Sequence, residues 1–237
     1  MCIRDRVNKD YDGAAVSAAE RLKIKIIRLV ESEKIAGLFS LDVKKDGDTV
    51  EEEAVNENDI ALILHTSGTT SKPKIVPLLQ SNIVASASNI AQSLSLSSSD
   101  RCMNVMPLFH IHGLIAAVSA SLSVGASIWC SPGFNALSFF SNLDEAKPTW
   151  YTAVPTMHQA ILARSGRNAE TIRNNPLRFL RSSSASLPAQ VMGELENCFG
   201  VPVIEAYGMT EATHQMCCNR LDKQKPGSVG IPVSYTH

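Results

Sequence analysis

The chain has 237 residues, of which 44% are hydrophobic and 19% are charged, and its formal net charge is −1. This length and apolar content suffice to bury a core in one large domain or in parts of two. The balanced charge does not favour nucleic acid or a membrane surface as a partner, and no apolar stretch reaches the roughly 20 residues of a membrane-spanning helix. The six cysteines form no CxxC pair, which favours reduced thiols in an intracellular protein over a zinc site.

The two ends of the chain do not continue the patterns beside them. We interpret "MCIRDR" at residues 1–6 and "SYTH" at residues 234–237 as non-native scars around a partial gene, and exclude them from the fold prediction. The chain is therefore expected to be a fragment without its natural termini. Residues 7–58 are expected to form part of a first subdomain and an acidic connection, and residues 59–233 the core that carries the site.

The predicted elements follow one another in an alternating order. Residues 14–30 predict a short helix that runs into a strand, and residues 44–59 predict a polar connection with a turn at Asp46–Gly47. Further strands are expected at residues 60–66, which have the pattern of a buried strand, and at 102–108, 126–130, 149–154, 178–185 and 201–208. Helices are expected at residues 80–96, 114–125, 135–146, 155–162 and 188–200. This alternation predicts an α/β fold of parallel βαβ units with helices on both sheet faces, whose ligands bind beyond the carboxyl ends of the strands.

The stretch "TSGTTSKPK" follows the strand expected at residues 60–66. Its hydroxyl groups can donate to phosphate oxygens, its glycine lets backbone N–H groups approach, and its lysines add positive charge. The Gly-Lys pair of the common phosphate loop is missing, so the stretch is not that motif. Composition alone leaves a solvated turn as the alternative. The groups concerned are Thr66, Ser67, Gly68, Thr69, Thr70, Lys72 and Lys74.

The stretch "PLFHIHG" holds two histidines, His110 and His112. In an extended segment their imidazoles would share one face, which would permit a metal pair. No carboxylate or cysteine lies nearby to complete a metal shell, which argues against that interpretation. We expect one histidine to point into a pocket and the other to be packed.

The third polar cluster comprises "RSSSASLP" and "EAYGMTEATH". Tyr207 could stack on an aromatic base, while Thr210 and Glu211 offer a hydroxyl and a carboxylate. A carboxylate beside a phosphate-binding loop suits Mg²⁺, which prefers oxygen ligands shared with phosphates. Taken alone, the cluster would be an ordinary strand-to-helix turn with Thr210 as a cap.

Together, "TSGTTSKPK", "PLFHIHG" and "YGMTE" in this order resemble the adenylate-forming enzymes, from about Asp59 to Pro232. These include acyl- and aryl-CoA synthetases, luciferases and the adenylation domains of peptide synthetases. "HTSGTTSKPK", "PLFHIHGLIA", "TWYTAVPTMHQ", "RSSSASLP", "EAYGMTEATH" and "KPGSVGIPV" are similar to the oxalate–CoA ligase branch. The resemblance implies that the chain is a fragment of the large N-terminal domain of an acyl-CoA synthetase-like fold.

In the family that the chain resembles, a carboxylic acid attacks the α-phosphate of ATP to give acyl-AMP and pyrophosphate, and coenzyme A then displaces AMP. The resemblance implies ATP, Mg²⁺ and coenzyme A as cofactors or co-substrates. It assigns catalytic roles to Thr210, Glu211 and His110, with Glu211 also holding Mg²⁺. The residues implied to bind ATP are Thr66, Ser67, Gly68, Thr69, Thr70 and Lys74 at the phosphates, and Ser184, Ala185, Ser186, Glu205, Ala206 and Tyr207 at the adenine.

The branch pattern implies that His110, Ser184 and His214 bind the acid. Imidazoles near an anion have their charged form favoured, and a serine supplies a neutral donor, so this polar trio predicts oxalate or a similar short dicarboxylate. For His214 the alternative is a histidine at a helix start with no ligand contact. Ile75 replaces the usual glycine of the family, which is harmless only if the backbone there is extended.

The family's C-terminal domain, with its adenylation lysine, would lie beyond His237. We therefore expect the chain alone to bind ATP weakly and not to complete adenylation. Two alternatives remain: another short- or medium-chain acyl- or aryl-CoA ligase, or a non-catalytic nucleotide-binding module. We expect an intracellular location, in the cytoplasm or the peroxisome, between which the sequence does not decide, and the sequence does not give the oligomeric state.

Overall fold

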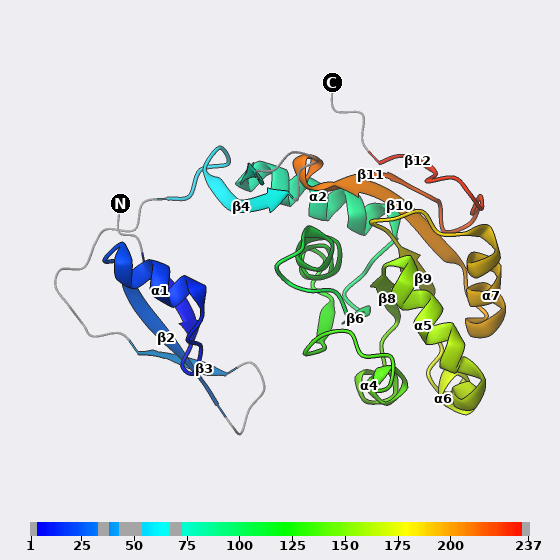
Figure 1. Ribbon diagram of the computed structural model, residues 1–237. Helices are drawn as coiled ribbons and strands as arrows, with labels where there is room; N and C mark the ends of the chain where they lie inside the picture. The colour runs from blue at the N-terminus through cyan, green and yellow to red at the C-terminus, as the bar shows by residue number, and fades with distance from the viewer. Residues whose placement is uncertain (1–3, 33–37, 43–53, 67–72, 234–237) are drawn as a thin grey trace. The chain divides into compact units, whose positions relative to one another are not determined.

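The computed structural model describes residues 4–32, 38–42, 54–66 and 73–233, in two compact units, Met1–Ala54 and Val55–His237 (Figure 1). The boundary falls inside the polar connection expected at residues 44–59. No helix in the described ranges combines the length and the apolar character that a membrane crossing requires. The described part of the first unit contains a three-stranded sheet, and that of the second unit contains a seven-stranded and a two-stranded sheet.

In the first unit, β2 (Lys25–Glu31) lies between a parallel partner, β1 (Arg4–Asn8), and an antiparallel partner, β3 (Phe39–Asp42). Helix α1 (Ala14–Arg21) connects β1 to β2, because parallel strands need a crossover. The helix and strand predicted within residues 14–30 are confirmed. Strand β1 lies outside the prediction, because residues 1–6 are excluded from it as a scar.

The main sheet of the second unit has seven strands within the described residues, in the order β12-β11-β10-β9-β8-β6-β7. Strands β7, β6, β8, β9 and β10 are mutually parallel, as predicted, while β11 and β12 add an antiparallel edge. This edge is not predicted, because its strands lack a clear apolar alternation. The strands are β6 (Arg101–Asn104), β7 (Ser127–Cys130), β8 (Trp150–Ala153), β9 (Phe179–Ser182), β10 (Val203–Met209), β11 (His214–Cys218) and β12 (Ile231–Pro232).

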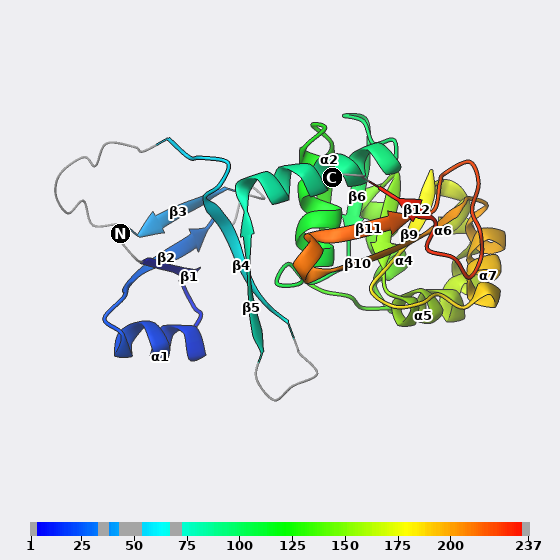
Figure 2. The ribbon, with the colours of Figure 1, turned by 90° about the horizontal axis from the view of Figure 1, so that it is seen from above.

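Helices cover both faces of this sheet, because its central strands are apolar on both sides (Figure 2). Tyr151 and Leu180 pack in one core with α4 (Phe139–Ala146), α5 (Pro155–Ser165), α6 (Ala169–Asn174) and α7 (Ala189–Phe199). Their neighbours Trp150 and Phe179 point to the opposite face. There they pack with α2 (Gln80–Ser93), the π-helix η1 (His112–Ser119) and α3 (Ala120–Leu122). The predicted arrangement of helices on both faces is confirmed.

The strand predicted at residues 60–66 is present as β4 (Ile60–Thr66), but the prediction that it is buried is wrong. It pairs with β5 (Lys74–Leu79) in a separate two-stranded antiparallel sheet, so Ile60 and Ile63 remain 57% and 53% exposed. Strand β5 is not predicted because it contains Pro77, which is tolerated here since both strands of such a ribbon are edges. Ile75 lies in extended β5, opposite His65, so the replacement of glycine strains nothing.

Candidate active site

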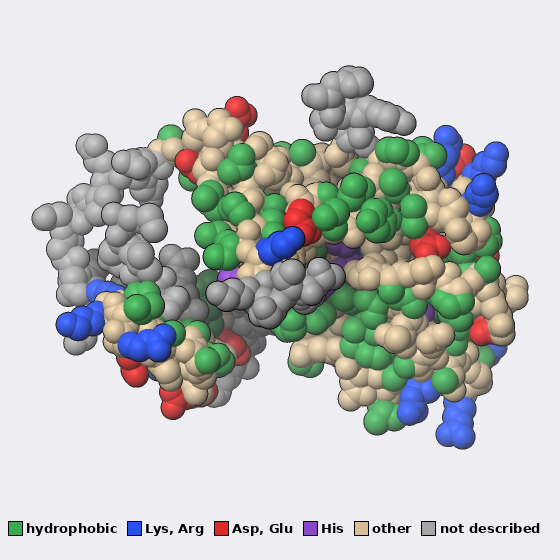
Figure 3. All heavy atoms as spheres, turned by 45° about the horizontal axis from the view of Figure 1, so that its top comes forward, with side chains coloured by type: hydrophobic (Ala, Val, Ile, Leu, Met, Phe, Trp, Pro, Cys, Tyr) green, Lys and Arg blue, Asp and Glu red, His purple; other side chains and the backbone are tan. Residues whose placement is uncertain are grey.

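A pocket of about 710 Å³ lies beyond the carboxyl ends of β9 and β10, at the open end of the β4–β5 ribbon. It brings together side chains that the sequence predicts from separate segments. The face drawn in Figure 3 carries a basic and an acidic side chain near its centre. A larger hollow of about 1090 Å³ between α5, α6 and α7 holds none of the nominated residues. The nominated residues that line the smaller pocket are Thr66, Lys74, His110, Ser184, Thr210, Glu211 and His214.

Four of the nominated phosphate ligands, Ser67, Gly68, Thr69 and Thr70, lie outside the described residues. Their two described neighbours, Thr66 at the end of β4 and Lys74 at the start of β5, are paired with each other in the ribbon. The hydroxyl oxygen of Thr66 is buried and has no hydrogen-bond partner in the described part of the chain. A buried hydroxyl without a partner is unfavourable unless another group satisfies it, so this atom is available to a ligand in the pocket.

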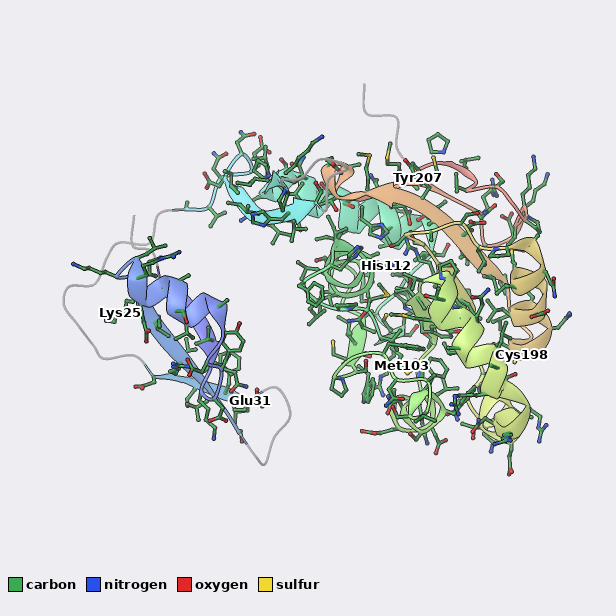
Figure 4. All side chains as sticks on the ribbon, in the orientation of Figure 1. Lys25, Glu31, Met103, His112, Cys198 and Tyr207 are labelled. Atoms are coloured by element: carbon green, nitrogen blue, oxygen red, sulfur yellow. The ribbon has the colours of Figure 1, made fainter. Side chains whose placement is uncertain are left out.

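Of the residues predicted to bind the adenine, Ser184 lines this pocket, and Ala185, Ser186, Glu205, Ala206 and Tyr207 do not. Tyr207 is 49% exposed near the carboxyl end of β10 (Figure 4), while Ala206 is buried. The buried carboxylate of Glu205 accepts a hydrogen bond from the backbone N–H of Leu187 at 2.9 Å. Glu205 therefore holds the loop after β9, which carries the exposed residues Ser184, Ala185 and Ser186.

Two pocket residues have left-handed backbone conformations that glycine normally adopts. Ser184 has a φ of 74° and His214 has a φ of 96°, and Thr213 beside it has a φ of 54°. Such conformations cost about 1–3 kcal/mol each and persist where the surrounding structure holds them, most often at functional sites. The carbonyl of Thr213 is held in place by the hydroxyl of Ser86 at 2.5 Å. The fold thus maintains the pocket wall against local strain.

The two histidines of "PLFHIHG" separate as expected: His110 is exposed and lines the pocket, while His112 is completely buried. The segment turns into η1 rather than staying extended, so the imidazoles do not share one face. The backbone N–H of His112 donates to Nδ1 of His110 at 3.1 Å. The Nδ1 of His110 is therefore an acceptor, and the neutral ring carries its proton on Nε2.

The packed histidine belongs to a polar network that the sequence prediction misses. Nδ1 of His112 lies 3.0 Å from the Ser184 hydroxyl, and its Nε2 lies 2.6 Å from the Thr152 hydroxyl. The guanidinium of Arg181 on β9 lies 3.2 Å from the same Nε2 and donates to Gln215 Oε1 at 2.8 Å. Figure 4 shows His112 inside the second unit. One feature of the sequence could have indicated this network. Arg181 lies within the apolar strand "RFLRS" of a parallel sheet, where both faces are normally buried, so a buried arginine was to be expected.

The surroundings of the three histidines of the site favour their neutral form, while the expectation that a bound anion favours their charged form stays a prediction. Burial lowers the pKa of His112 and of His214 well below the usual value, and the positive charge of Arg181 lowers both further. Partial removal of His110 from water also lowers its pKa. Nδ1 of His214 is buried without a hydrogen-bond partner in the described residues. Like the hydroxyl of Thr66, it is an unsatisfied polar atom of a residue that lines the pocket.

Glu211 occupies the same pocket as Lys74 and Thr210, on the turn η3 (Thr210–Ala212) after β10. Its carboxylate is exposed and forms no hydrogen bond to the described residues. Free carboxylate oxygens beside groups that suit phosphate oxygens are the ligand set that Mg²⁺ prefers. The residues present therefore fit the magnesium ion that the resemblance implies.

The fold is that of the adenylate-forming class of enzymes. A family model of AMP-binding enzymes matches residues 5–237, and the chain belongs to this family. It is 44% identical over 233 residues to an oxalate–CoA ligase of Arabidopsis thaliana, covering 95% of this chain and 45% of the relative. An oxalate–CoA ligase of Saccharomyces cerevisiae is 44% identical over 184 residues, covering 76% of this chain and 33% of the relative.

A solved malonyl-CoA ligase, in a ternary product complex with methylmalonyl-CoA and AMP, superimposes with a TM-score of 0.77 at 26% identity. That match covers 96% of this chain and 46% of the other. The chain thus spans less than half the length of each of these proteins.

Proposed function

We propose that this chain carries the ATP- and acid-binding part of a ligase that joins a short dicarboxylic acid, with oxalate as the first candidate, to coenzyme A. The acid attacks the α-phosphate of ATP to form acyl-AMP and pyrophosphate, and the thiol of coenzyme A then displaces AMP. The observation that carries the proposal is the shared pocket. Lys74, Thr66 and Glu211 offer it groups for a magnesium–triphosphate, while His110, Ser184 and His214 offer it groups for an acid.

At the phosphate end, the Thr66 hydroxyl and the Lys74 ammonium would bind phosphate oxygens, together with Thr210 and the residues Ser67 to Thr70. Mg²⁺ held by Glu211 would neutralise charge on the phosphates. Little covalent help from the protein is needed for this step, because positioning and charge neutralisation supply most of the acceleration. Tyr207, exposed at the end of β10, would face the adenine.

At the acid end, the Ser184 hydroxyl and the ring nitrogens of His110 and His214 would meet the carboxylate that does not react. Three polar groups at this end of the pocket favour a second carboxylate over an alkyl chain, which would leave them unsatisfied. The identity with the two oxalate–CoA ligases supports oxalate within this class. A ligase of this kind would act where ATP and coenzyme A are available, in the cytoplasm or the peroxisome.

A chimera tests the proposal directly. Residues 7–233 of this chain would replace the matching segment of the Arabidopsis thaliana oxalate–CoA ligase, to which the chain is 44% identical. Pyrophosphate release would then be measured with oxalate, malonate, succinate, acetate, hexanoate and benzoate. We expect the highest kcat/KM with oxalate. A preference for a monocarboxylic acid would overturn the assignment in favour of another acyl- or aryl-CoA ligase.

The second candidate, a non-catalytic nucleotide-binding module, predicts that the chimera binds ATP and releases pyrophosphate with none of these acids. The chain by itself is expected to bind ATP weakly and to form no acyl-AMP. Robust acyl-AMP formation by the isolated chain would contradict this expectation.

A further inference from the structure

Arg181 is completely buried, yet no carboxylate pairs with it in the described part of the chain. The ion pairs found there join Arg178 to Asp100 and Arg220 to Asp222. Among the described residues, the guanidinium of Arg181 contacts only neutral groups, and its Nε has no hydrogen-bond partner. An unpaired buried charge is costly, and replacing it with an apolar side chain is often neutral or stabilising, so its presence calls for a role other than stability.

The contact between Arg181 and His112 determines where the His112 proton lies. A guanidinium has donors and no acceptor, so the Nε2 of His112 that faces it at 3.2 Å presents its lone pair. The Thr152 hydroxyl, 2.6 Å from the same Nε2, donates to it as well and accepts from Arg181 at 3.3 Å. In the opposite tautomer an N–H would face the guanidinium. The proton of the neutral ring is therefore on Nδ1.

The tautomer of His112 in turn orients the hydroxyl of Ser184. Nδ1–H donates to Ser184 Oγ at 3.0 Å, so this oxygen is an acceptor and its own proton is free. Ser184 is exposed and lines the pocket. With the other tautomer, the serine proton would be used on Nδ1, and a lone pair would face the pocket and repel an anion.

We infer that Arg181 is a positioning residue for the acid substrate, acting through His112 to keep the Ser184 hydroxyl proton directed at a carboxylate. The inference rests on the proposed function only for the identity of the anion. Arg181 does not line the pocket, so it acts without touching the substrate.

The tautomer itself can be read without any enzymatic assay. In the ¹⁵N-histidine-labelled chain, two-bond ¹H–¹⁵N correlation spectra distinguish Nδ1–H from Nε2–H rings, and His112→Asn identifies the signals of His112. We expect Nδ1–H in the unsubstituted chain and in Arg181→Lys, which keeps a cationic donor, and a shift toward Nε2–H in Arg181→Met. Arg178→Met removes a cation that pairs with Asp100 at 2.6 Å, and should leave the pattern unchanged. An Nε2–H ring in the unsubstituted chain, or no change in Arg181→Met, would overturn the inference.

The consequence for the substrate is measured in the chimera. Arg181→Met should raise the KM for oxalate about 10- to 100-fold, the effect of one lost hydrogen bond to a charged group, with the KM for ATP changed less than about twofold. Against a Ser184→Ala background the same substitution should raise the KM for oxalate less than about threefold, because the two residues act as one unit. Equal losses in both backgrounds would show a merely structural role. A chimera that releases no pyrophosphate with oxalate would refute the proposed function, while the NMR result would still decide the tautomer of His112.

Discussion

The rings of His112 and His214 meet edge to face, with their centroids 5.1 Å apart and their planes inclined by 62°. One ring belongs to the π-helix η1 and the other to the first residue of β11, so the contact joins the helical layer to the antiparallel edge of the sheet. Both rings are buried and lie near the positive charge of Arg181. Protonation of either ring is unfavourable in the folded chain, so acid is expected to lower the free energy of unfolding.

The first prediction is a loss of stability below neutral pH. Burial lowers the pKa of His112 and His214 well below their ordinary value, and lowers that of His158 to about 4. Unfolding restores values near 6.5, so the unfolded chain binds protons that the folded chain does not. The free energy of unfolding should therefore be level above about pH 7.5 and fall by about 1.4 kcal/mol per pH unit per histidine below about pH 6.5.

Urea unfolding between about pH 5 and 8 measures this slope. His158→Gln removes one of the four histidines whose pKa is lowered, His110 being the fourth, and should reduce the slope by about a quarter to a third. The carboxyl of Asp100 titrates below this window, because hydrogen bonds from Thr149 and Arg178 outweigh its burial and bring its pKa below the ordinary value. A free energy of unfolding that stays constant down to about pH 5 would contradict the assignment of neutral histidines.

The second prediction concerns Gly208, which lies at the bulge between β10 and β11 and lines the pocket. A Cβ atom there would overlap the carbonyl oxygen of His214. Gly208→Ala should therefore push β11 away, lower the free energy of unfolding by more than about 3 kcal/mol and abolish acid binding. Thermal unfolding and oxalate titration would measure the two effects.

Gly193 provides the matched control, because a Cβ atom added there, within α7, would meet nothing within 4 Å. Gly193→Ala should raise the free energy of unfolding by about 0.5–1 kcal/mol, since alanine loses less backbone entropy in a helix. If both substitutions had the same small effect, the bulge would not be the constraint that the structure indicates.

The third prediction separates the two ends of the pocket. In the chimera, Lys74→Ala should raise the KM for ATP about 10-fold or more with little change in the KM for oxalate, because it removes a cation from the phosphate end. His214→Ala should show the reverse pattern, with turnover of oxalate falling far more than ATP affinity. Steady-state kinetics with each substrate varied in turn would check both. Parallel losses for both substrates in His214→Ala would count against its role in acid binding.

The fourth prediction tests the buried carboxylate at the opposite end of the sheet. Asp100 accepts hydrogen bonds from Arg178 at 2.6 Å, from Thr149 at 2.7 Å and from the backbone of Ser97 at 2.9 Å. Asp100→Ala leaves these donors unsatisfied and should cost about 2–4 kcal/mol of stability, and Asp100→Asn should cost less because it retains an acceptor. Urea unfolding gives both values. Unchanged KM values in the chimera would confirm that this end of the sheet is structural.

The sequence by itself determined the α/β class and, apart from α6, the helix–strand order between residues 101 and 209, because apolar periodicity and glycine stops are local properties. Gly200, for example, ends α7 in the left-handed conformation that favours glycine. The segments that meet at the pocket were also recognisable, since their composition suits anions. The exposure of β4 could not be recognised from the sequence, because it depends on pairing with β5 rather than with the central sheet.

Only the tertiary structure decided which polar side chains meet. His112 and Arg181 are 69 residues apart, and Arg181 reaches the buried histidine because β9 lies between β8 and β10 while η1 packs on the same face. Sheet order and helix placement are set by the summed burial of many apolar side chains, which no local pattern encodes. For this reason the sequence indicated a histidine in the pocket, and the fold alone revealed the arginine behind it.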